Sequence, residues 1–275
     1  MKLINSKVEI LEPIGYTIDD IYKQIEIAGR TCYKSEDKIT PTSAKEFVDR
    51  MIKSGHGTML EHGTVYLDIP NSAGNYNLVP FFASNPYSKV VIKPLNDRVH
   101  NYITTNFRVI VENFAEEYIP DVLQYICEPT EFHEKRISVR WTCDRGVSHE
   151  FVRHRVFSFA QESTRYCNYS KDKFGHEITY IQPCWEMQKD EEELFLLQLE
   201  QAQNAYNALI SSGWRPQQAR AILPNALKTE LVMTGFESDW KHFFELRCDA
   251  AAHPDARKLA LELYNKLYNK EYGKE

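Results

Sequence analysis

Arginine and hydroxyl side chains gather in one short segment of the chain, residues 153–166. It reads R-H-R-V-F-S-F-A-Q-E-S-T-R-Y and holds three arginines within fourteen residues. Apolar side chains are interleaved with the charges: Val156, Phe157, Phe159 and Tyr166. Full solvation of the segment would expose these aromatic rings, and partly buried arginines need anionic partners. Because a guanidinium group binds phosphate oxygens in pairs, the segment predicts a phosphate-binding site. A solvated surface of charges stays open as the alternative.

The pattern R-H-R-x-x-S-x-x-x-x-S-x-R in this segment resembles the signature of flavin-dependent thymidylate synthases. The chain has every fixed position of the signature, namely Arg153, His154, Arg155, Ser158, Ser163 and Arg165. Six fixed positions in one short window make a chance match improbable. The resemblance is therefore specific.

Four further segments are similar to those of the same family and occur in the family's order. They are A-G-R-T-C-Y at 28–33, G-H-G-T-M-L-E-H at 55–62, R-A-I-L-P at 220–224 and F-F-E-L-R at 243–247. Each segment is weak evidence by itself. Together with the signature they extend the resemblance over roughly residues 28–260, apart from an excursion at about 70–135.

The resemblance implies an enzyme that makes dTMP from dUMP. Methylenetetrahydrofolate would supply the carbon, reduced FAD the hydride, and NADPH would regenerate the reduced flavin. In such an enzyme the cofactors carry the chemistry, whereas the protein supplies orientation and electrostatics. A homotetramer with active sites shared between subunits is also implied.

The resemblance also implies residue roles, position by position. The dUMP site would comprise Glu150, Arg153, Gln161, Glu162, Ser163, Thr164, Arg165, Arg220 and Arg247. The FAD site would comprise His56, Thr58, Arg153, His154, Arg155, Gln161 and His242. Ser163 and Arg165 would hold the phosphate, and Arg247 would act in catalysis by stabilising negative charge as uracil N3 ionises. Gln161 and His242 depart from the Glu or Asn that other members carry at these positions.

Several other interpretations compete with these roles. His56 and His62 could be capping or core-edge histidines, and Arg220 could be a surface residue. Arg247 shares a helix face with Trp240 and Phe243, so it needs a partner, either a protein carboxylate or a ligand. A non-catalytic nucleotide- or RNA-binding protein could use the same arginine segment.

Two motifs are weaker than they look. Cys184 follows a proline, as does the nucleophile of the unrelated classical thymidylate synthases, but no obvious activator of a thiolate stands near it. A buried structural cysteine is expected there. Residues 55–60 resemble the start of a dinucleotide fingerprint, yet the third glycine is absent and the segment precedes a strand instead of following one.

Composition narrows the class of protein. The chain has 275 residues and a net charge of −6, which argues against broad binding of nucleic acids. No apolar run approaches the roughly 20 residues of a membrane helix, and no apolar signal core stands at the start, so a cytoplasmic protein is expected. The six cysteines include no C-x-x-C pair and no histidine cluster at zinc spacing, so neither disulfides nor a metal site is expected.

The secondary-structure patterns predict an α+β fold, with helices packed on a mostly antiparallel sheet. Strands are expected at 8–11, 64–69 and 137–141. Helices are expected at 17–28, after a capping box of Ser43 and Glu46, at 147–152, from 190 to Gly213, from Pro216 to Pro224, after a cap at Ser238, and from Pro254.

The segment at about 70–135 is read as an insertion into a single domain of residues 1–275. Residues 71–87, rich in Asn, Ser, Pro and aromatic residues, indicate a loop or irregular excursion. Residues 101–125 indicate helical stretches broken at Pro120. The two strands that flank this segment could then be neighbours in the sheet.

Overall fold

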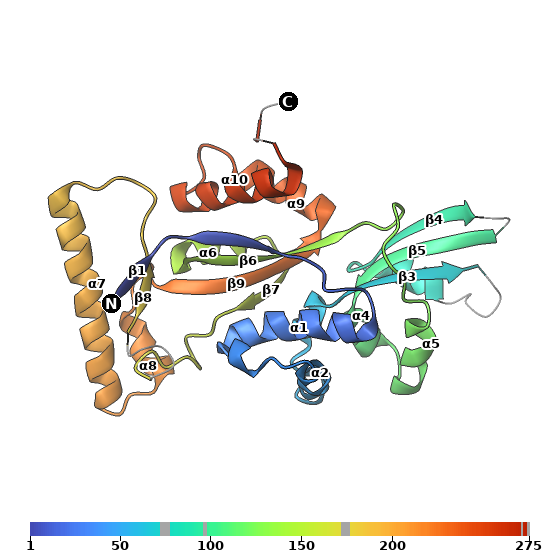
Figure 1. Ribbon diagram of the computed structural model, residues 1–275, viewed down its shortest axis with the longest axis horizontal. Helices are drawn as coiled ribbons and strands as arrows, with labels where there is room; N and C mark the ends of the chain where they lie inside the picture. Colours follow the sequence, from blue (N-terminus) through green and yellow to red (C-terminus); the bar gives the residue numbers. More distant parts are fainter. Residues whose placement is uncertain (72–77, 96–97, 172–176, 271, 274–275) are drawn as a thin grey trace.

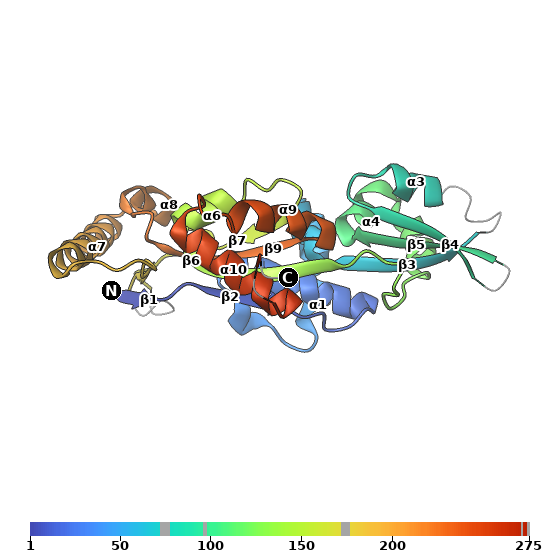
Figure 2. The ribbon, with the colours of Figure 1, turned by 90° about the horizontal axis from the view of Figure 1, so that it is seen from above.

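The computed structural model describes residues 1–71, 78–95, 98–171, 177–270 and 272–273. Three sheets and their helices follow one another along an elongated molecule (Figure 1 and Figure 2). Two of the sheets are wholly antiparallel, and the described strands include one parallel pair, in the smallest sheet. The predicted α+β class with a mostly antiparallel sheet is confirmed. Among the described residues, no helix is both long and apolar enough to span a bilayer.

The central sheet has four strands in the order β2-β6-β9-β7. Its strands are β2 (Lys7–Leu11), β6 (Arg136–Asp144), β7 (Ser158–Gln161) and β9 (Lys228–Phe236). Side chains alternate between the two faces of a strand, and in β9 this sends Met233 to one face and Thr234 to the other. The two faces therefore carry different chemistry.

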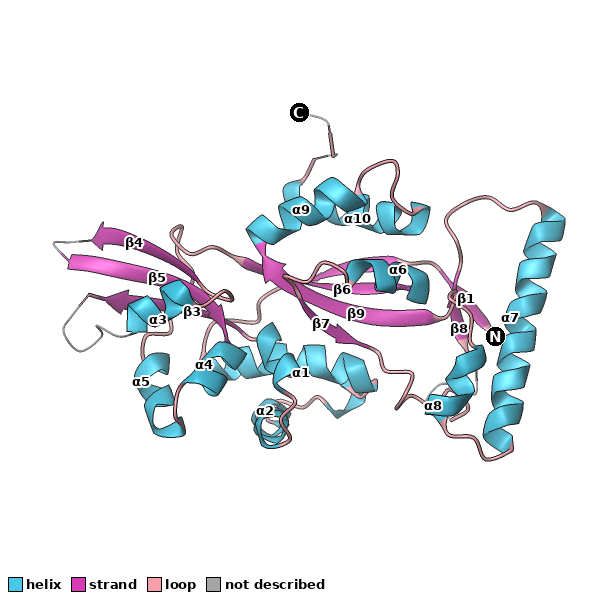
Figure 3. Ribbon diagram, turned by 180° about the vertical axis from the view of Figure 1, so that it is seen from behind, coloured by secondary structure: helices cyan, strands magenta, loops and turns pink. Residues whose placement is uncertain are grey.

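An aromatic core covers the first face of the central sheet. It forms against the helices α6 (Arg145–Phe151), α9 (Glu237–Arg247) and α10 (Pro254–Tyr268). Trp141 of β6 contacts Phe243 of α9 with ring centroids 5.7 Å apart, and Phe151 lies 5.2 Å from Phe243. The core fixes α6 and α9 next to each other, as Figure 3 shows from behind.

The second face of the sheet is polar and thinly covered. The helix α1 (Ile18–Tyr33) and the 3₁₀ helix η2 (Gly57–His62) lie below it in Figure 1. Thr17 and Asp20 form a capping box that begins α1. The buried apolar cluster on this face includes only Ala28, Ala160 and Val232, while Ser138, Thr234 and His62 meet there through hydrogen bonds.

A second sheet, of order β3-β5-β4, lies beyond the N-terminal end of α1 and has a hydrophobic core of its own. Its strands are β3 (Thr64–Pro70), β4 (Lys89–Leu95) and β5 (Arg98–Asn106). The helical segments of this half are α2 (Ser43–Lys53), α3 (Leu78–Ser84), α4 (Phe107–Asn113), α5 (Ile119–Leu123) and η4 (Glu116–Tyr118). The 3₁₀ helix η1 (Glu36–Lys38) follows the C-terminal end of α1.

The opposite end of the molecule is built by the parallel pair β1 (Lys2–Ile4) and β8 (Thr179–Ile181). The long helix α7 (Lys189–Ser211) packs here through Leu199 and Tyr206. It is followed by α8 (Pro216–Ala219) and the 3₁₀ helix η6 (Arg220–Ile222). The predicted helix from 190 to Gly213 and the one that begins at Pro216 are confirmed.

Predictions within the insertion are partly wrong. Residues 101–106 belong to β5 instead of a helix, and Pro120 lies in the first turn of α5 instead of breaking a helix. Proline is tolerated in the first turn because the amide it lacks has no partner there. Part of the expected loop at 71–87 is the helix α3, while residues 72–77 lie outside the described residues.

The strands on either side of the insertion are not neighbours. The strand β3 pairs with β5, whereas β6 lies between β2 and β9 in the other sheet. The insertion therefore contributes strands to a separate sheet. The organisation as a single domain of residues 1–275 stays a prediction.

The two predicted helix caps are also wrong, although the helices exist. Ser43 is the first residue of α2, and its hydroxyl donates to the Glu26 carboxylate. Ser238 lies inside α9, and its hydroxyl donates to Glu134. Gly55 follows the end of α2 with a φ of 70°, which favours glycine.

Candidate functional site

Arg247, at the end of α9, is held by three hydrogen bonds within the chain. Its Nε donates to Nε2 of His154 at 3.0 Å, and one Nη donates to the Glu150 backbone carbonyl at 2.8 Å. The other Nη donates to the Glu150 carboxylate. The side chain is 15% exposed. The partner that a charge on this helix face needs is therefore a protein carboxylate, one of the two alternatives left open by the sequence.

The elements that carry these residues are positioned by the aromatic core. Asp144 caps α6 by accepting from the Val147 amide at 2.8 Å, and Glu150 follows near the end of that short helix. Because α9 packs on the same core, its last residue reaches Glu150, 97 positions away in the sequence. The bonds leave Arg247 little rotational freedom.

His154 lies between this ion pair and His242. The ring accepts from Arg247, so the ring is neutral at that nitrogen, and it is buried. Burial first, then the charges of Arg247 and His242, lower the pKa of His154 to about 4. The His154 and His242 rings have centroids 6.3 Å apart, with His242 exposed and within 3.4 Å of the Glu245 carboxylate.

Ser163, Thr164 and Arg165 follow β7 and meet α8 and η6. Arg220 donates to the Thr164 hydroxyl at 3.0 Å, and Arg165 Nε donates to the Gln217 side chain at 3.2 Å. Both guanidinium groups are exposed, and no carboxylate of the described residues lies within 4 Å of either. Two guanidinium groups and two hydroxyl side chains therefore share one surface patch, a donor set that suits a phosphate.

Glu162 points away from this patch, into the protein. Its carboxylate is 3% exposed, accepts from Lys228 Nζ at 2.8 Å and accepts from the Tyr169 hydroxyl at 3.3 Å. Lys228 also bonds Glu230 at 2.6 Å, and Lys34 bonds Glu230 at 3.0 Å. Although burial alone would raise it, the pKa of Glu230 is lowered by these two lysines. The network fastens the segment after β7 to β9.

Gln161 is committed to contacts inside the chain in a similar way. Its Nε2 donates to the Ser148 hydroxyl at 2.9 Å and to the Thr229 hydroxyl at 3.2 Å. These bonds tie the end of β7 to α6 and to β9. Gln161 thus links the element that carries Glu150 to the segment that carries Arg165.

The remaining arginines of the signature, Arg153 and Arg155, are exposed. The partial burial predicted for the arginines of this segment is therefore wrong within a single chain. Val156 and Tyr166 are also exposed, by 62% and 59%, so the chain does leave apolar side chains beside the charges. Phe157 is buried against Trp240, with the two ring centroids 4.7 Å apart. A side chain in place of Gly235 would collide with the Phe157 ring.

His56 and Thr58 are exposed at the beginning of η2. The next residue, Met59, lies 3.8 Å from the Cys32 thiol, and the Cys32 carbonyl accepts from the Ser163 amide at 3.0 Å. The C-terminal end of α1 therefore brings η2 beside the segment of Ser163, although η2 and that segment are about 100 residues apart in the sequence.

His62 is a core histidine, one of the two interpretations left open. It is 2% exposed, and its Nδ1 lies 2.8 Å from the Thr234 hydroxyl. Burial first, then the charge of Arg136, lower its pKa to about 3, against the opposing influence of the nearby Phe159 carbonyl. His62 is therefore neutral at ordinary pH.

Sequence reasoning missed the residues that hold the site together. Lys228, Tyr169, Ser148 and Thr229 bind Glu162 or Gln161, but no motif marks any of them. One signal was available, since Lys228 and Glu230 alternate with the buried Thr229 and Leu231 as residues of a strand do.

The expectation of a buried Cys184 is wrong, because this cysteine is exposed. Burial of part of the thiol first, then the Asp255 carboxylate, raise its pKa, which disfavours the nucleophilic thiolate. Cys32, Cys127, Cys143, Cys184 and Cys248 are free thiols. Within the part of the chain that the structure describes, no group of His, Cys, Asp and Glu side chains has the arrangement of a metal site.

Known proteins resemble this chain in sequence. The model of the family described as "Thymidylate synthase complementing protein" matches residues 91–270. A flavin-dependent thymidylate synthase of Geobacter sulfurreducens is 34% identical over 119 residues, which are 43% of this chain and 50% of that protein. One of Pyrococcus furiosus is 32% identical over 58% of this chain and 65% of that protein. One of Mycolicibacterium vanbaalenii is 25% identical over 86% of this chain and 72% of that protein.

The chain thus spans half to two thirds of the length of the first two relatives. Among solved structures, a UMP/dUMP methylase from Streptomyces cacaoi bound with 5-Br dUMP covers 98% of this chain at 15% identity. The TM-score of that comparison is 0.46, and it covers 93% of the methylase chain. The family model matches well over half of the chain, and on this ground the chain belongs to the thymidylate synthase complementing protein family.

Proposed function

We propose that this protein is a flavin-dependent thymidylate synthase, a methyltransferase that converts dUMP into dTMP. The carbon donor is methylenetetrahydrofolate, the cofactor is FAD, and NADPH is the reductant. Membership of the family and the names of the relatives support this activity. The observation that carries it is the patch in which the exposed guanidinium groups of Arg165 and Arg220 stand beside the hydroxyl groups of Ser163 and the buried Thr164, without a competing carboxylate among the described residues.

In this proposal the patch binds the phosphate of dUMP. Arg165 and Arg220 supply charge-assisted hydrogen bonds, and Ser163 and Thr164 supply hydroxyl groups. The Glu162 carboxylate is already engaged by Lys228, so its part in dUMP binding is to hold the segment in place. Gln161 has the same kind of role through Ser148 and Thr229.

Arg247 is proposed to act at the uracil ring. Its three bonds to Glu150 and His154 hold the guanidinium group in one orientation before substrate arrives. A positive group that needs no reorganisation stabilises charge that develops on the pyrimidine. Burial first, and then the charge of Arg153, lower the pKa of Arg247 against the opposing influence of the Glu150 carboxylate.

The residues assigned to FAD fit a flavin dinucleotide in their chemistry. Arg153 and Arg155 are exposed and have no carboxylate partner among the described residues, as a diphosphate requires. His154, His242, His56 and Thr58 add ring and hydroxyl groups, and Gln161 lies at the adjoining strand end. Bound FAD would supply the hydride transfer, while these side chains orient it and exclude water.

A homotetramer with shared sites is part of the proposal. Val156 and Tyr166 are exposed by 62% and 59% beside the signature arginines, and Leu246, next to Arg247, is 49% exposed. Apolar side chains around a polar site are what a subunit contact would cover. The absence of nucleic-acid binding and the cytoplasmic location stay predictions.

An assay with omissions tests the proposal. Purified protein is incubated with dUMP, methylenetetrahydrofolate, NADPH and FAD, and dTMP is measured with each component left out in turn. The proposal expects a yellow protein, bleaching of the flavin by NADPH, and no dTMP when any component is missing. A colourless protein that cannot be loaded with FAD would instead favour the non-catalytic nucleotide binder.

A further inference from the structure

Two exposed side chains stand at the beginning of the 3₁₀ helix η2. They are His56 and Thr58, and neither side chain forms a hydrogen bond with another described residue. Both are therefore free to meet a ligand, but their positions depend on the backbone that carries them. The contacts that hold this backbone decide how well the two side chains are placed.

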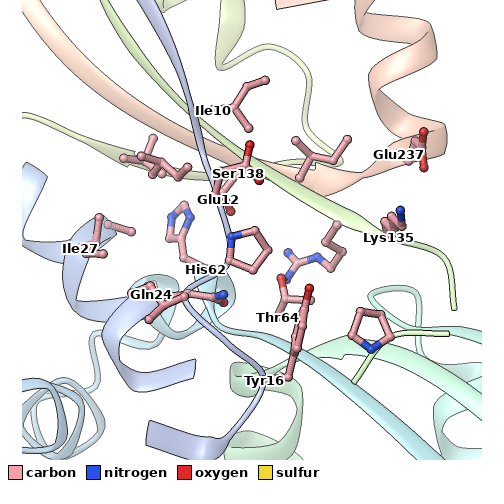
Figure 4. A pocket seen from close by; sticks show the side chains of 18 of the residues that line it. Ile10, Glu12, Tyr16, Gln24, Ile27, His62, Thr64, Lys135, Ser138 and Glu237 are labelled. Atoms are coloured by element: carbon pink, nitrogen blue, oxygen red, sulfur yellow. The ribbon is translucent and has the colours of Figure 1, made fainter. Parts of the chain in front are cut away.

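The C-terminal end of η2 is held by burial on one side and borders a cavity on the other. Leu60 and His62 are buried, and the Gly63 carbonyl accepts from the Phe107 amide at 2.9 Å. His62 also borders a cavity of about 390 Å³ between α1 and β6, with Ser138 in its wall (Figure 4). Close packing of apolar side chains therefore does not fix η2 on the side of this cavity.

An arginine of the insertion binds η2 from the other side. Arg108, the second residue of α4, donates from one Nη to the Glu61 carboxylate at 2.6 Å and from Nε to the Glu112 carboxylate at 2.8 Å. Glu61 belongs to η2, whereas Glu112 lies one turn further along α4. The beginning of α4 is itself fixed, because Asn106 caps it by accepting from the Val109 amide at 3.2 Å. Arg108 therefore links the insertion to η2.

Glu61 is bound by a second arginine, from the central sheet. Arg136 of β6 donates from Nη1 to the Glu61 backbone carbonyl at 3.0 Å. The carboxylate and the carbonyl of one residue thus receive donors from the insertion and from the central sheet. The side chains of Arg108 and Glu61 are 36% and 25% exposed, so their ion pair contributes little to the free energy of unfolding. Its effect is expected on the local position of η2.

Gly57 packs the main chain of η2 directly against the same ion pair. A Cβ atom on Gly57 would lie 2.5 Å from a Glu112 carboxylate oxygen and 3.1 Å from Nε of Arg108. The main chain between His56 and Thr58 can therefore approach the pair this closely because residue 57 has no side chain. Arg108 thus meets η2 at two points, one of them between the two exposed side chains.

We propose that Arg108 is a positioning residue for the flavin, which acts through Glu61 and Gly57 on His56 and Thr58. The inference rests on the proposed function, in which His56 and Thr58 bind FAD. Arg108 sets where the imidazole and the hydroxyl group stand, and the insertion thereby takes part in cofactor binding. Because its bonds go to carboxylates of the chain, Arg108 needs no contact with FAD for this role.

Charge reversal in the whole protein tests the inference. In Arg108→Glu a carboxylate replaces the cation between Glu61 and Glu112, so like charges repel and η2 loses its link to α4. The dissociation constant for FAD, measured by flavin fluorescence, should rise about tenfold, while the affinity for dUMP without FAD stays within about twofold. In protein with isotope-labelled histidine, the ring resonances of His56 should move and those of His154 should stay.

An exchange of charges separates positioning from a general loss of structure. Glu61→Arg alone should weaken FAD binding as Arg108→Glu does. The two substitutions together re-form the pair with its signs exchanged, so the dissociation constant for FAD should return to within about threefold of the original value. Unfolding would not respond to this exchange.

Lys45→Glu is the matched control. Lys45 pairs with Asp49 four residues further along α2, at 2.6 Å, as Arg108 pairs with Glu112 on α4, but the Lys45 pair does not include a residue of η2. Its reversal should leave FAD affinity within about twofold. Equal weakening by Lys45→Glu and Arg108→Glu would show that FAD responds to the net charge of the protein, and the inference would be wrong.

Arg108→Gln covers the case in which the reversal does not fold. It removes the charge without repulsion, and the dissociation constant for FAD should rise about threefold to fivefold. Unchanged FAD affinity together with unmoved His56 resonances would overturn the inference and leave the proposed function intact. Failure of the original protein to bind FAD would overturn both.

Discussion

Arg247 and Arg165 are both assigned to the same substrate, yet the chain treats them differently. Arg247 is 15% exposed and bonded three times within the chain, to Glu150 and His154. Arg165 is exposed and bonds Gln217 through Nε alone among its side-chain donors. A guanidinium group that is held in advance suits charge stabilisation, because it need not reorganise. One with donors to spare suits capture of a phosphate from solvent.

Behind the patch of Arg165 and Arg220 lies a buried ion network. Lys228, Glu162, Glu230 and Lys34 form it under the segment of Arg165. Three features can therefore be compared: the preorganised Arg247, the exposed Arg165, and the buried network of Lys228 and Glu162 that positions the segment of Arg165. Substitutions should separate these parts, because each part should affect a different measurement.

Lys228→Met should have the largest effect of these substitutions, and the quantity that it lowers is the free energy of unfolding. Among the described residues it leaves the buried Glu162 carboxylate with the Tyr169 hydroxyl as its hydrogen-bond donor, while Glu230 keeps Lys34. Breaking a buried pair in this way costs about 3–5 kcal/mol of unfolding free energy. Urea denaturation measures the change, and Lys45→Met is the control, since its pair with Asp49 is exposed and worth about 1 kcal/mol or less. Equal loss in both variants would contradict a buried network.

Arg247→Ala should come next, and on catalysis. The turnover number should fall by roughly 10²–10³-fold, as when one preorganised donor to a developing anion is removed. The protein should stay folded and yellow, which circular dichroism and flavin absorbance check. If turnover stays within a few-fold of the original protein, Arg247 is not a catalytic residue.

Arg165→Lys should affect dUMP binding alone. Lysine keeps the charge but loses the planar fork, so the KM for dUMP should rise about tenfold while FAD affinity is unchanged. Arg215→Lys, an exposed arginine at the start of α8, is the control and should leave both constants as they are. Equal weakening of dUMP and FAD would contradict the assignment of Arg165 to the phosphate.

The neutral His154 predicts a smaller effect of pH. The pKa of this histidine is lowered from 6.5 to about 4, so the unfolded chain binds more protons than the folded one between these values. The stabilisation that the folded state gains from a neutral His154 is therefore complete above the unfolded pKa of 6.5. It is lost as the pH falls from about 6.5 towards 4. Between about pH 7 and 5.5 the unfolding free energy should drop by about 1 kcal/mol from this group.

The measurement is urea denaturation of the original protein and of His154→Asn at the two pH values. Asparagine can still accept from Arg247 but does not titrate, so the drop in the variant should be smaller by that amount. His62, whose pKa is also lowered, titrates in both proteins and cancels in the comparison. Identical drops in the two proteins would show that the pKa of His154 is the same in the folded and the unfolded chain.

Cys184→Ala should have the smallest effect. Cys184 is exposed, and its pKa is raised by burial of part of the thiol and by Asp255, which outweigh the opposing charge of Lys258. Turnover should stay within about twofold, as for most surface substitutions. Steady-state dTMP formation measures it, and a dead variant would revive a nucleophilic cysteine.

Much of the fold could be predicted because many elements have a periodic surface. The strand at 8–11, the strand at 137–141 and the helix from Pro254 have one buried face each, and all three exist. The strand β9 was missed because it is buried on both faces over most of its length, which erases the alternation. The strand β5 was missed, and helical stretches were predicted in its place, because its buried residues include the polar Asn101, Thr104 and Asn106, which hide the alternation of a strand.

The features of the candidate site also divide into those that the sequence indicated and those that it did not. Residue types and spacing alone selected Arg153, Ser163 and Arg165, because a signature is a local property of the chain. Spacing could not indicate that these arginines lie exposed or that Glu162 turns inward to Lys228, 66 positions away. Such pairs depend on how β7 and β9 meet in the sheet.

The sequence by itself determined the family, through the residue types and intervals that its segments share with it. It also determined that Arg247 must find a partner, since a charge on an aromatic helix face is costly without one. Only the tertiary structure decided that the partner is Glu150. The physical reason is that partners far apart in sequence are chosen by the packing of whole elements, which no local pattern records.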